Sequence, residues 1–230
     1  MVKYFTWRFL AELPRGIAYK LRGRLFLLRS YPAQFRRIFQ TRGWGGPSLS
    51  GGSSTLENTE ILRQELPDLL RRHEVRSLLD IPCGDWYWMR QVALDGVEYV
   101  GADIVEELIE LNRRAFAAPQ RRFVVKDLCA DELPRVDMIL CRDCLIHLRL
   151  RLGMAAVAGI RRSGSKYLLM STYPNCKKNR ELPSGFWRPI NLRLPPFSFP
   201  EPLELLTDSA RADASRSERY LGLWRIADLG

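Results

Sequence analysis

The chain has 230 residues, 46% of them hydrophobic and 27% charged, a composition that supports a sizeable core and excludes an intrinsically disordered protein. No uninterrupted apolar run approaches the ~20 residues that a membrane span needs, and the arginine-studded N-terminus lacks the pattern of a secretory signal. The five cysteines are odd in number and lie in apolar surroundings, which suits a reducing compartment, so we expect a cytoplasmic protein.

Residues 1–42 carry most of the net charge of +10, because they hold ten basic side chains and one acid, whereas the remainder is close to neutral. Apolar and aromatic residues at helical spacing are interleaved with these basic ones, which predicts a helical extension. Three roles fit it: a lid on the folded domain, a segment lying on an anionic membrane surface at the inner face of the membrane, or a nucleic-acid anchor. Nucleic acid is the least favoured, because phosphate tracking usually also recruits basic residues from the folded body.

Residues 43–75 begin with the Gly/Ser-rich stretch GWGGPSLSGGSSTLENTE (43–60), which is either a loop closing over a site or a plain linker. Ser54 and Glu57 have the spacing of a capping box and predict a helix N-terminus. Leucines at helical spacing continue an apolar face from there, and Pro67 is expected to kink or divide the helix.

From residue 76 onward, strand-like and helix-like segments alternate. Helices are predicted over 105–118 and 149–163, and strands over 76–81, 98–104, 122–127, 136–143 and 166–173. This alternation indicates an α/β fold with a mostly parallel sheet covered on both faces. The segment RYLGLWRIADLG (219–230) is predicted to be a final antiparallel strand at the edge of the sheet.

Polar residues follow four successive predicted strands. They are Asp80 and Gly84, then Asp103, then Asp127, and finally Asp143 and His147. Open parallel sheets bind their ligands beyond the carboxyl ends of the strands, near the first strand. One such aspartate is ordinarily a turn residue, but four in succession predict a ligand site.

These segments resemble class I S-adenosylmethionine-dependent methyltransferases over residues 76–174. LLDIPCGDW is similar to their first motif, YVGADI to the motif of the second strand, and VKDLCADELPRVDMILCRDCLIHL to the third and fourth strands. Within the family, the resemblance is strongest to a bacterial subgroup. In that subgroup a Trp-Gly and Ser-Gly-rich loop precedes the domain, the first motif reads Pro-Cys-Gly-Asp, and a segment like GFWRPINLRLPPFSFP follows the fifth strand, extending the match from Trp44 to about Leu206.

The resemblance implies a Rossmann-like, doubly wound sheet of seven strands that binds S-adenosylmethionine. By resemblance, Asp103 would accept both ribose hydroxyls, Asp127 would bind the adenine amino group, and Leu128 would pack on the adenine ring. The methionine end would lie against Asp80 and the Cys83–Gly84 backbone, and a sulfonium is favoured beside the aromatic faces of Trp86 and Trp88. The predicted cofactor residues are Asp80, Cys83, Gly84, Asp85, Trp86, Asp103, Ile104, Asp127 and Leu128.

Two other chemistries compete for this pattern. A nicotinamide enzyme needs a third glycine in the first turn for close helix–strand packing, and this chain has bulky residues there instead. Cys141 and Cys144 have metal-ligand spacing, but no second pair accompanies them, so we expect no metal site.

Transfer of a methyl group to a hydroxyl also requires a base that removes the hydroxyl proton. His147 is the best candidate, because imidazole titrates near working pH. Asp143 would orient His147 or serve as base itself, and Asp85 is a third candidate. The fourth strand ends in CRDCL rather than Asn/Asp-Pro-Pro-aromatic, which argues against N-methylation of nucleobases.

The acceptor loop is predicted over 174–200. It supplies the candidate donors Arg188 and Asn191 and the candidate walls Phe186, Trp187 and Phe197, and Trp44 is added from the Gly/Ser loop.

The sequence therefore predicts a methyltransferase domain over 76–230, preceded by a closing segment (43–75) and a helical extension (1–42). The favoured reaction is O-methylation of a sugar, a glycan or another small hydroxylated acceptor. The alternatives are an RNA-modifying methyltransferase anchored by the basic extension and a non-catalytic module that keeps the cofactor fold for association.

Overall fold

A seven-stranded sheet forms the centre of the molecule, in a computed structural model that describes residues 28–210 and 218–230. The strand order is β3-β2-β1-β4-β5-β7-β6. The strands are β1 (Ser77–Asp80), β2 (Glu98–Asp103), β3 (Arg121–Val125), β4 (Met138–Cys141), β5 (Tyr167–Thr172), β6 (Glu204–Thr207) and β7 (Tyr220–Arg225). The first five pair in parallel and β7 pairs antiparallel with both β5 and β6, which confirms the predicted Rossmann-like, mostly parallel sheet.

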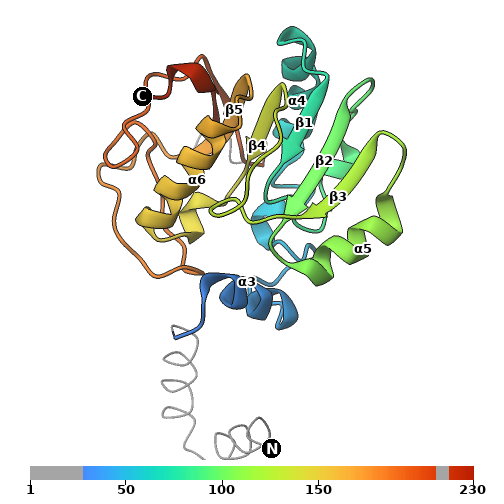
Figure 1. Cartoon of the computed structure of the whole chain (residues 1–230), viewed down its shortest axis with the longest axis horizontal. Coiled ribbons are helices and arrows are strands. Elements are labelled where there is room, and N and C mark those ends of the chain that lie inside the picture. Colours follow the sequence, from blue (N-terminus) through green and yellow to red (C-terminus); the bar gives the residue numbers. More distant parts are fainter. Residues whose placement is uncertain (1–27, 211–217) are drawn as a thin grey trace, which may run out of the picture.

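Both faces of the sheet are buried beneath helices. Successive residues of a strand point to opposite faces, so neighbouring residues belong to different cores. In β1, Leu78 belongs to the hydrophobic core on the face that α4 (Glu60–Arg72) and α5 (Glu106–Phe116) cover, and Leu79 belongs to the core beneath α6 (Leu150–Arg162). Figure 1 shows α6 and α4 on opposite faces of the sheet. The predicted helices and parallel strands match these elements to within three residues at each end.

The edge of the sheet differs from the prediction. The C-terminal strand β7 is antiparallel as expected, but it lies between β5 and β6 rather than at the edge. The edge strand is β6, a four-residue strand that directly follows the proline-rich loop. Its shortness leaves too little alternation to be recognised in the sequence.

The helix start predicted at Ser54 is also wrong. Ser54 ends the short 3-10 helix η1 (Gly52–Ser54), and α4 begins at Glu60. The Ser54 hydroxyl accepts a hydrogen bond from Arg142 (3.3 Å) instead of capping a helix. Pro67 lies inside α4 without dividing it.

Helix α3 (Tyr31–Gln40) is the described part of the predicted extension. It lies beyond one end of the sheet, near α5 (Figure 1). Arg36 and Gln40 both donate to the Glu107 carboxylate of α5 (2.6 and 3.2 Å). The apolar positions predicted before residue 28 lie outside the described residues. Within residues 28–210 and 218–230, no helix combines the length and the apolar character needed to cross a membrane.

Candidate cofactor and acceptor site

A cavity opens at the carboxyl ends of the parallel strands, between the sheet, α3 and the Gly/Ser loop. The side chains of Phe35 and Phe39 in α3 and the loop residues Ser50 and Ser53 contribute to its wall. Ten of the predicted site residues line it: Trp44, Asp80, Cys83, Gly84, Asp103, Ile104, Asp127, Leu128, Asp143 and His147. Residues of the Gly/Ser stretch therefore line the cavity, as a loop that closes over a site would.

The turn after β1 brings the backbone close to the loop above it. Gly84 has a φ of +56°, in the left-handed region that glycine adopts without strain. A Cβ at this position would lie 2.0 Å from the Ser50 Oγ, so the close approach also excludes any side chain. The Pro-Cys-Gly-Asp turn thus has its glycine at a position where both the backbone conformation and the contact with Ser50 exclude other residues.

The Asp103 carboxylate is held at the end of β2 by two backbone amides. The amide of Gly84 donates to Oδ2 (3.2 Å), and the amide of Val105 donates to Oδ1 (3.0 Å). Burial raises the pKa of Asp103 to about 6, although these amide hydrogen bonds act in the opposite direction. Each carboxylate oxygen has a second lone pair, so Asp103 can accept further donors from the cavity.

Asp80 lies deeper, at the end of β1. The Tyr99 hydroxyl donates to its Oδ2 (2.6 Å), and the carboxyl group is 3% exposed. Burial raises the pKa of Asp80 to about 7, with the Tyr99 hydrogen bond and the Arg142 charge opposing the rise. Asp80 therefore changes charge near neutral pH, and a cation in the cavity would favour its ionised form.

Helix α3 contacts the site directly through Tyr31, a residue that is not among those predicted from the sequence. The Tyr31 hydroxyl donates to Oδ2 of Asp127, whose Oδ1 accepts the backbone amide of Cys129 (2.8 Å). Burial and the Asp127 charge raise the pKa of Tyr31 well above its ordinary value, so it stays a neutral donor. The helix is thereby attached to a predicted cofactor residue.

Asp85, predicted to bind cofactor or act as base, does not line the cavity. Its carboxylate accepts hydrogen bonds from the Ser48 hydroxyl (2.9 Å), the Leu49 amide (2.7 Å) and the Ser50 hydroxyl (3.1 Å). These donors come from the Gly/Ser loop, so Asp85 fixes the loop over the cavity. The prediction is corrected because the loop supplies the donors that a ligand was expected to supply.

Of the two tryptophans expected beside a sulfonium, only Trp88 lines the cavity. Trp86 has a φ of +55° and packs in the core against Tyr99, Phe116 and Phe123, with ring centroids 5.0–5.8 Å away. The prediction for Trp86 is therefore corrected: its backbone is left-handed, and its indole ring packs in the core instead of facing the cavity.

His147 ends the short 3-10 helix η3 (Leu145–His147), at the mouth of the cavity. Its ring stacks on Trp44, with 5.1 Å between centroids and 30° between planes. His147 Nδ1 lies 3.3 Å from the carbonyl oxygen of Phe186. Burial lowers the pKa of His147 below its ordinary value, although the nearby Asp143 charge acts in the opposite direction.

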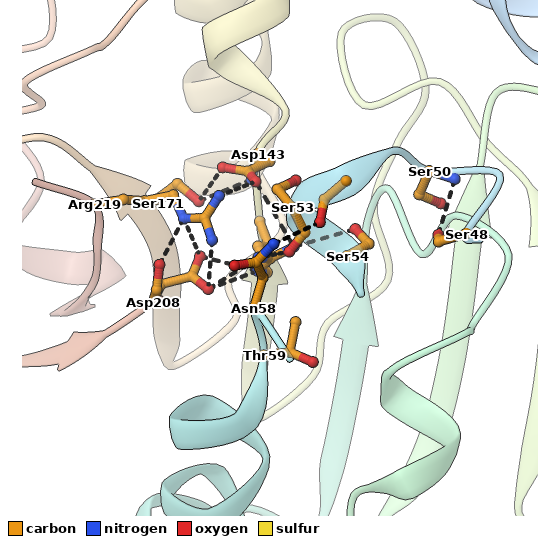
Figure 2. Close-up of polar contacts among 12 residues, drawn as sticks. Ser48, Ser50, Ser53, Ser54, Asn58, Thr59, Asp143, Ser171, Asp208 and Arg219 are labelled. Atoms are coloured by element: carbon orange, nitrogen blue, oxygen red, sulfur yellow. Dashed lines mark hydrogen bonds and ion pairs between the residues drawn. The ribbon is translucent and has the colours of Figure 1, made fainter. Parts of the chain in front are cut away.

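Asp143 belongs to an ionic cluster that the sequence did not reveal (Figure 2). Its Oδ2 lies 3.1 Å from Arg219 Nη1 and 3.7 Å from Arg142 Nη1, and its backbone amide donates to Ser171. Both arginines also pair with the fully buried Asp208, at 2.9 Å. Burial alone would raise the pKa of Asp143, but the charges of Arg142 and Arg219 outweigh it and hold that pKa below its ordinary value.

The cluster also fastens the Gly/Ser loop to the sheet. Arg142 follows β4 and donates through Nη2 to the carbonyl oxygen of Ser53 (2.7 Å) and through Nη1 to the Ser54 hydroxyl. Figure 2 shows Ser53 close to the carboxylate of Asp143. The arginine is 5% exposed, so these contacts form with little competition from water.

Three predicted acceptor residues in 174–200 lie outside the cavity. Arg188 is buried and donates to the carbonyl oxygens of Ile146 and Leu148, on either side of His147. The Asn191 amide group donates to carbonyl oxygens of its own loop, and Phe197 packs in the core beneath α6. All three predictions are corrected. The donors of Arg188 and Asn191 bind backbone carbonyl oxygens rather than a ligand, and Phe197 is part of the core. Nor do the candidate walls Phe186 and Trp187 line the cavity; both side chains are exposed.

In the part of the chain that the structure describes, no group of three or more His, Cys, Asp or Glu side chains is placed to hold a metal ion. The five cysteines are free thiols.

Solved methyltransferases have the same fold. The magnesium protoporphyrin IX methyltransferase of Synechocystis PCC 6803 with bound SAM is 15% identical, with a TM-score of 0.55 over 86% of this chain and 97% of that one. The 1,6-didemethyltoxoflavin-N1-methyltransferase of Burkholderia thailandensis, with 1,6-didemethyltoxoflavin and S-adenosylhomocysteine bound, is 16% identical, with a TM-score of 0.55 over 84% and 86%. Human N-acetylserotonin methyltransferase in complex with SAM is 12% identical, with a TM-score of 0.56 over 84% of this chain and 56% of that one.

No family model and no curated protein matches the sequence. The fold itself is unambiguous: the chain has the fold of class I S-adenosylmethionine-dependent methyltransferases.

Proposed function

We propose that this protein is an S-adenosylmethionine-dependent methyltransferase that methylates a hydroxyl group of a small acceptor, with a sugar or glycan favoured. The observation that carries the proposal is the shared cavity. It joins the strand-end carboxylates Asp80, Asp103 and Asp127 to a candidate base, His147, in the fold of this enzyme class. When bound, the cofactor would supply an electrophilic methyl group on a sulfonium.

The residues at the end of β2 suit the ribose of that cofactor. Asp103 retains acceptor capacity on both carboxylate oxygens after taking the two backbone amides, which matches two hydroxyl donors. Ile104 lines the same part of the cavity and provides an apolar contact. Gly84 also lines the cavity, where a residue without a side chain lets a ligand approach the backbone.

The adenine would lie between Leu128 and α3. Asp127 would accept the adenine amino group, and the second lone pair on each carboxylate oxygen allows it to do so while Tyr31 still donates. Phe35 and Phe39 cover the cavity from above. Among the three roles predicted for the extension, the lid is the one that these contacts support.

The electrostatics of the deeper cavity favour a cation. Asp80 and the face of Trp88 both line it, and a carboxylate and an aromatic face each attract positive charge. Arg142 also reaches the cavity, but Asp208 and Asp143 counter its charge.

We assign His147 as the general base. A carbonyl oxygen only accepts hydrogen bonds, so the contact with Phe186 places the proton on Nδ1 and leaves Nε2 as the acceptor. The lowered pKa keeps the ring neutral at physiological pH, as a base must be. Asp143 is engaged by two arginines and is a weaker base, so we assign it the role of stabilising the imidazolium that forms.

Two observations favour a small-molecule acceptor over a nucleobase. Strand β4 is followed by Arg142, Asp143 and Cys144 instead of the motif expected for nucleobase amines. One of the similar structures, an N1-methyltransferase, has a small molecule, 1,6-didemethyltoxoflavin, bound together with S-adenosylhomocysteine. The subgroup with the Pro-Cys-Gly-Asp motif leads us to favour a sugar or glycan among such acceptors.

The test is transfer of a labelled methyl group from S-adenosylmethionine to a panel of sugars, glycans and other small alcohols. His147→Gln should lower kcat by about 10²–10⁴-fold while leaving cofactor affinity unchanged, because only proton removal is lost. The matched control is His73→Gln at the far end of α4, where the ring contacts Glu204 and not the cavity. Transfer by His147→Gln at the wild-type rate would contradict the assignment. Cofactor binding without transfer to any acceptor would favour the non-catalytic module.

Peripheral membrane contact through residues 1–42 remains a second, separate proposal. Its support is the excess of basic residues interleaved with aromatic ones, most of which precede residue 28. Sedimentation with anionic vesicles, comparing the full chain with one that lacks residues 1–27, tests it. Equal sedimentation of the two would contradict it.

A further inference from the structure

A second concave surface lies on the loop that follows β5. Its lining residues are Cys176, Lys177, Lys178, Arg180, Leu182, Trp187, Arg188 and Pro189, and we call this surface the basic groove. Half of these residues are basic and none is acidic. Trp187, 57% exposed, gives the groove an apolar wall.

Within residues 28–210 and 218–230, the exposed positive charges of the basic groove have no acidic partner. Among the described residues, no acid forms an ion pair with Lys177, Lys178 or Arg180, and all three side chains are exposed. Glu181, the acid next in sequence, accepts the Leu150 amide at the start of α6 (2.8 Å). By contrast, Arg193 of the same loop is paired with Glu201 (2.6 Å).

The groove is held in shape by buried amides. Asn179, between Lys178 and Arg180, is 7% exposed and donates to the carbonyl oxygens of Asn191 (2.9 Å), Leu194 (3.2 Å) and Pro195 (3.0 Å). The side-chain oxygen Oδ1 of Asn179 in turn accepts a hydrogen bond from the Asn191 backbone amide (2.9 Å). Because this anchor points inward, its two basic neighbours are presented to solvent from a fixed backbone, which lowers the ordering cost of binding an anion.

The basic groove adjoins the candidate base. Arg188 forms part of the groove and binds the carbonyl oxygens on either side of His147, and the Gly185 amide donates to the His147 carbonyl oxygen (2.8 Å). Trp187 contacts Tyr173 just beyond β5, with 6.1 Å between ring centroids. Within residues 185–188, Trp187 and Arg188 thus line the groove, and Gly185, Phe186 and Arg188 contact His147 or the backbone beside it.

We infer that the basic groove binds a phosphate or pyrophosphate group of the acceptor while the hydroxyl to be methylated lies beside His147. This inference rests on the proposed methyltransferase function and narrows its acceptor to phosphorylated compounds. Two lysines and one arginine that have no acidic partner among the described residues are the donor set that phosphate oxygens select. The exposed Trp187 ring suits the apolar face of the sugar or other ring that carries the phosphate.

The test uses inorganic pyrophosphate as the probe, titrated calorimetrically into the full chain at low ionic strength. The groove variant carries Lys177→Gln, Lys178→Gln and Arg180→Gln. The matched control carries Arg122→Gln, Arg135→Gln and Arg161→Gln, three exposed arginines outside both cavities, so the two variants lose the same charge. We expect the groove variant to bind pyrophosphate more than tenfold more weakly and the control to bind it as the wild type does. Equal affinities in all three proteins, or equal losses in both variants, would overturn the inference.

Two further arms identify the source of the phosphate. Loss of binding to anionic phospholipid vesicles in the groove variant, together with loss of pyrophosphate binding, would place the phosphate on a lipid-linked acceptor; unchanged vesicle binding would indicate a soluble one. Binding of an RNA oligonucleotide through the groove without any pyrophosphate binding would overturn the inference in favour of nucleic acid.

Cofactor affinity is measured on the same samples and should be equal in all three proteins. If the wild type does not bind S-adenosylmethionine, the proposed function fails, whereas the pyrophosphate titrations still decide the groove.

Discussion

Removal of the Asp208 carboxylate should destabilise the protein far more than removal of a comparable surface carboxylate. Asp208 is fully buried and accepts hydrogen bonds from Arg142 (2.9 Å) and Arg219 (3.2 Å). Asp208→Ala removes one of the two carboxylates that these arginines share and leaves Asp143 as the other. Loss of one partner from a buried ion pair typically costs about 3–5 kcal/mol. In a chain of this size each kcal/mol lowers Tm by about 2–4 °C, so we expect a decrease on the order of 10 °C.

Asp68→Ala is the matched control. Asp68 also pairs with two arginines, Arg71 and Arg72, but its side chain is 50% exposed and the pairs lie on the surface of α4. We expect a cost of less than about 1 kcal/mol for this variant, because solvent screens the charges. Thermal unfolding followed by circular dichroism measures both variants. Equal Tm values for Asp208→Ala and Asp68→Ala would refute the role of the ionic cluster in stability.

Three further predictions concern the cavity. Gly84→Ala should weaken both folding and cofactor binding, because its Cβ would overlap Ser50 Oγ at 2.0 Å; unchanged Tm and affinity would contradict the tight turn. The acid limb of the kcat/KM profile should lie below pH ~6.5, since burial lowers the pKa of His147 and the protonated ring accepts no proton; a limb above pH 7 would contradict this. Cofactor affinity should fall as the pH drops through about 6, where Asp103 becomes protonated. At pH 5 about a tenth of the Asp103 carboxyl groups are ionised, so calorimetry should give ~tenfold weaker binding than at pH 8, and a flat profile would show that ionisation is not required.

The sequence predicted the parts of the site that the fold class places by rule. Asp80 and Asp103 end parallel strands and Asp127 lies two residues beyond a third, and the carboxyl ends of parallel strands meet at one edge of the sheet. His147 and Trp44, which were predicted separately, both line the cavity and stack on each other. The strands themselves were recognisable because they are buried on both faces and read as apolar runs.

Contacts between residues far apart in the chain could not be predicted. Tyr31 meets Asp127 across 96 positions, and Arg142 meets Asp208 across 66. The local pattern of apolar and polar residues does not indicate such contacts, and the strand order of the fold does not require them. The division of the chain at residues 42 and 75 likewise stays a prediction, although α3 and the Gly/Ser loop both line the cavity.

Side-chain direction in irregular segments was the other source of error. In the sequence, Trp86 and Trp88 are equally good candidates to face the cavity. Only the backbone conformation decides which ring lines it. Arg188 and Asn191 show the same ambiguity, because a loop near a site contains many buried carbonyl groups that need donors. Polar residues in such a loop therefore predict function less reliably than polar residues at strand ends.

The most direct test of the central claim is calorimetric titration of S-adenosylmethionine into the wild type, Asp103→Ala and the control Asp95→Ala, an exposed aspartate outside the cavity. We expect micromolar binding by the wild type and the control, and a loss of affinity of more than about tenfold, ~1.4 kcal/mol, in Asp103→Ala. Absence of binding by the folded wild type, or equal affinity in all three proteins, would contradict it.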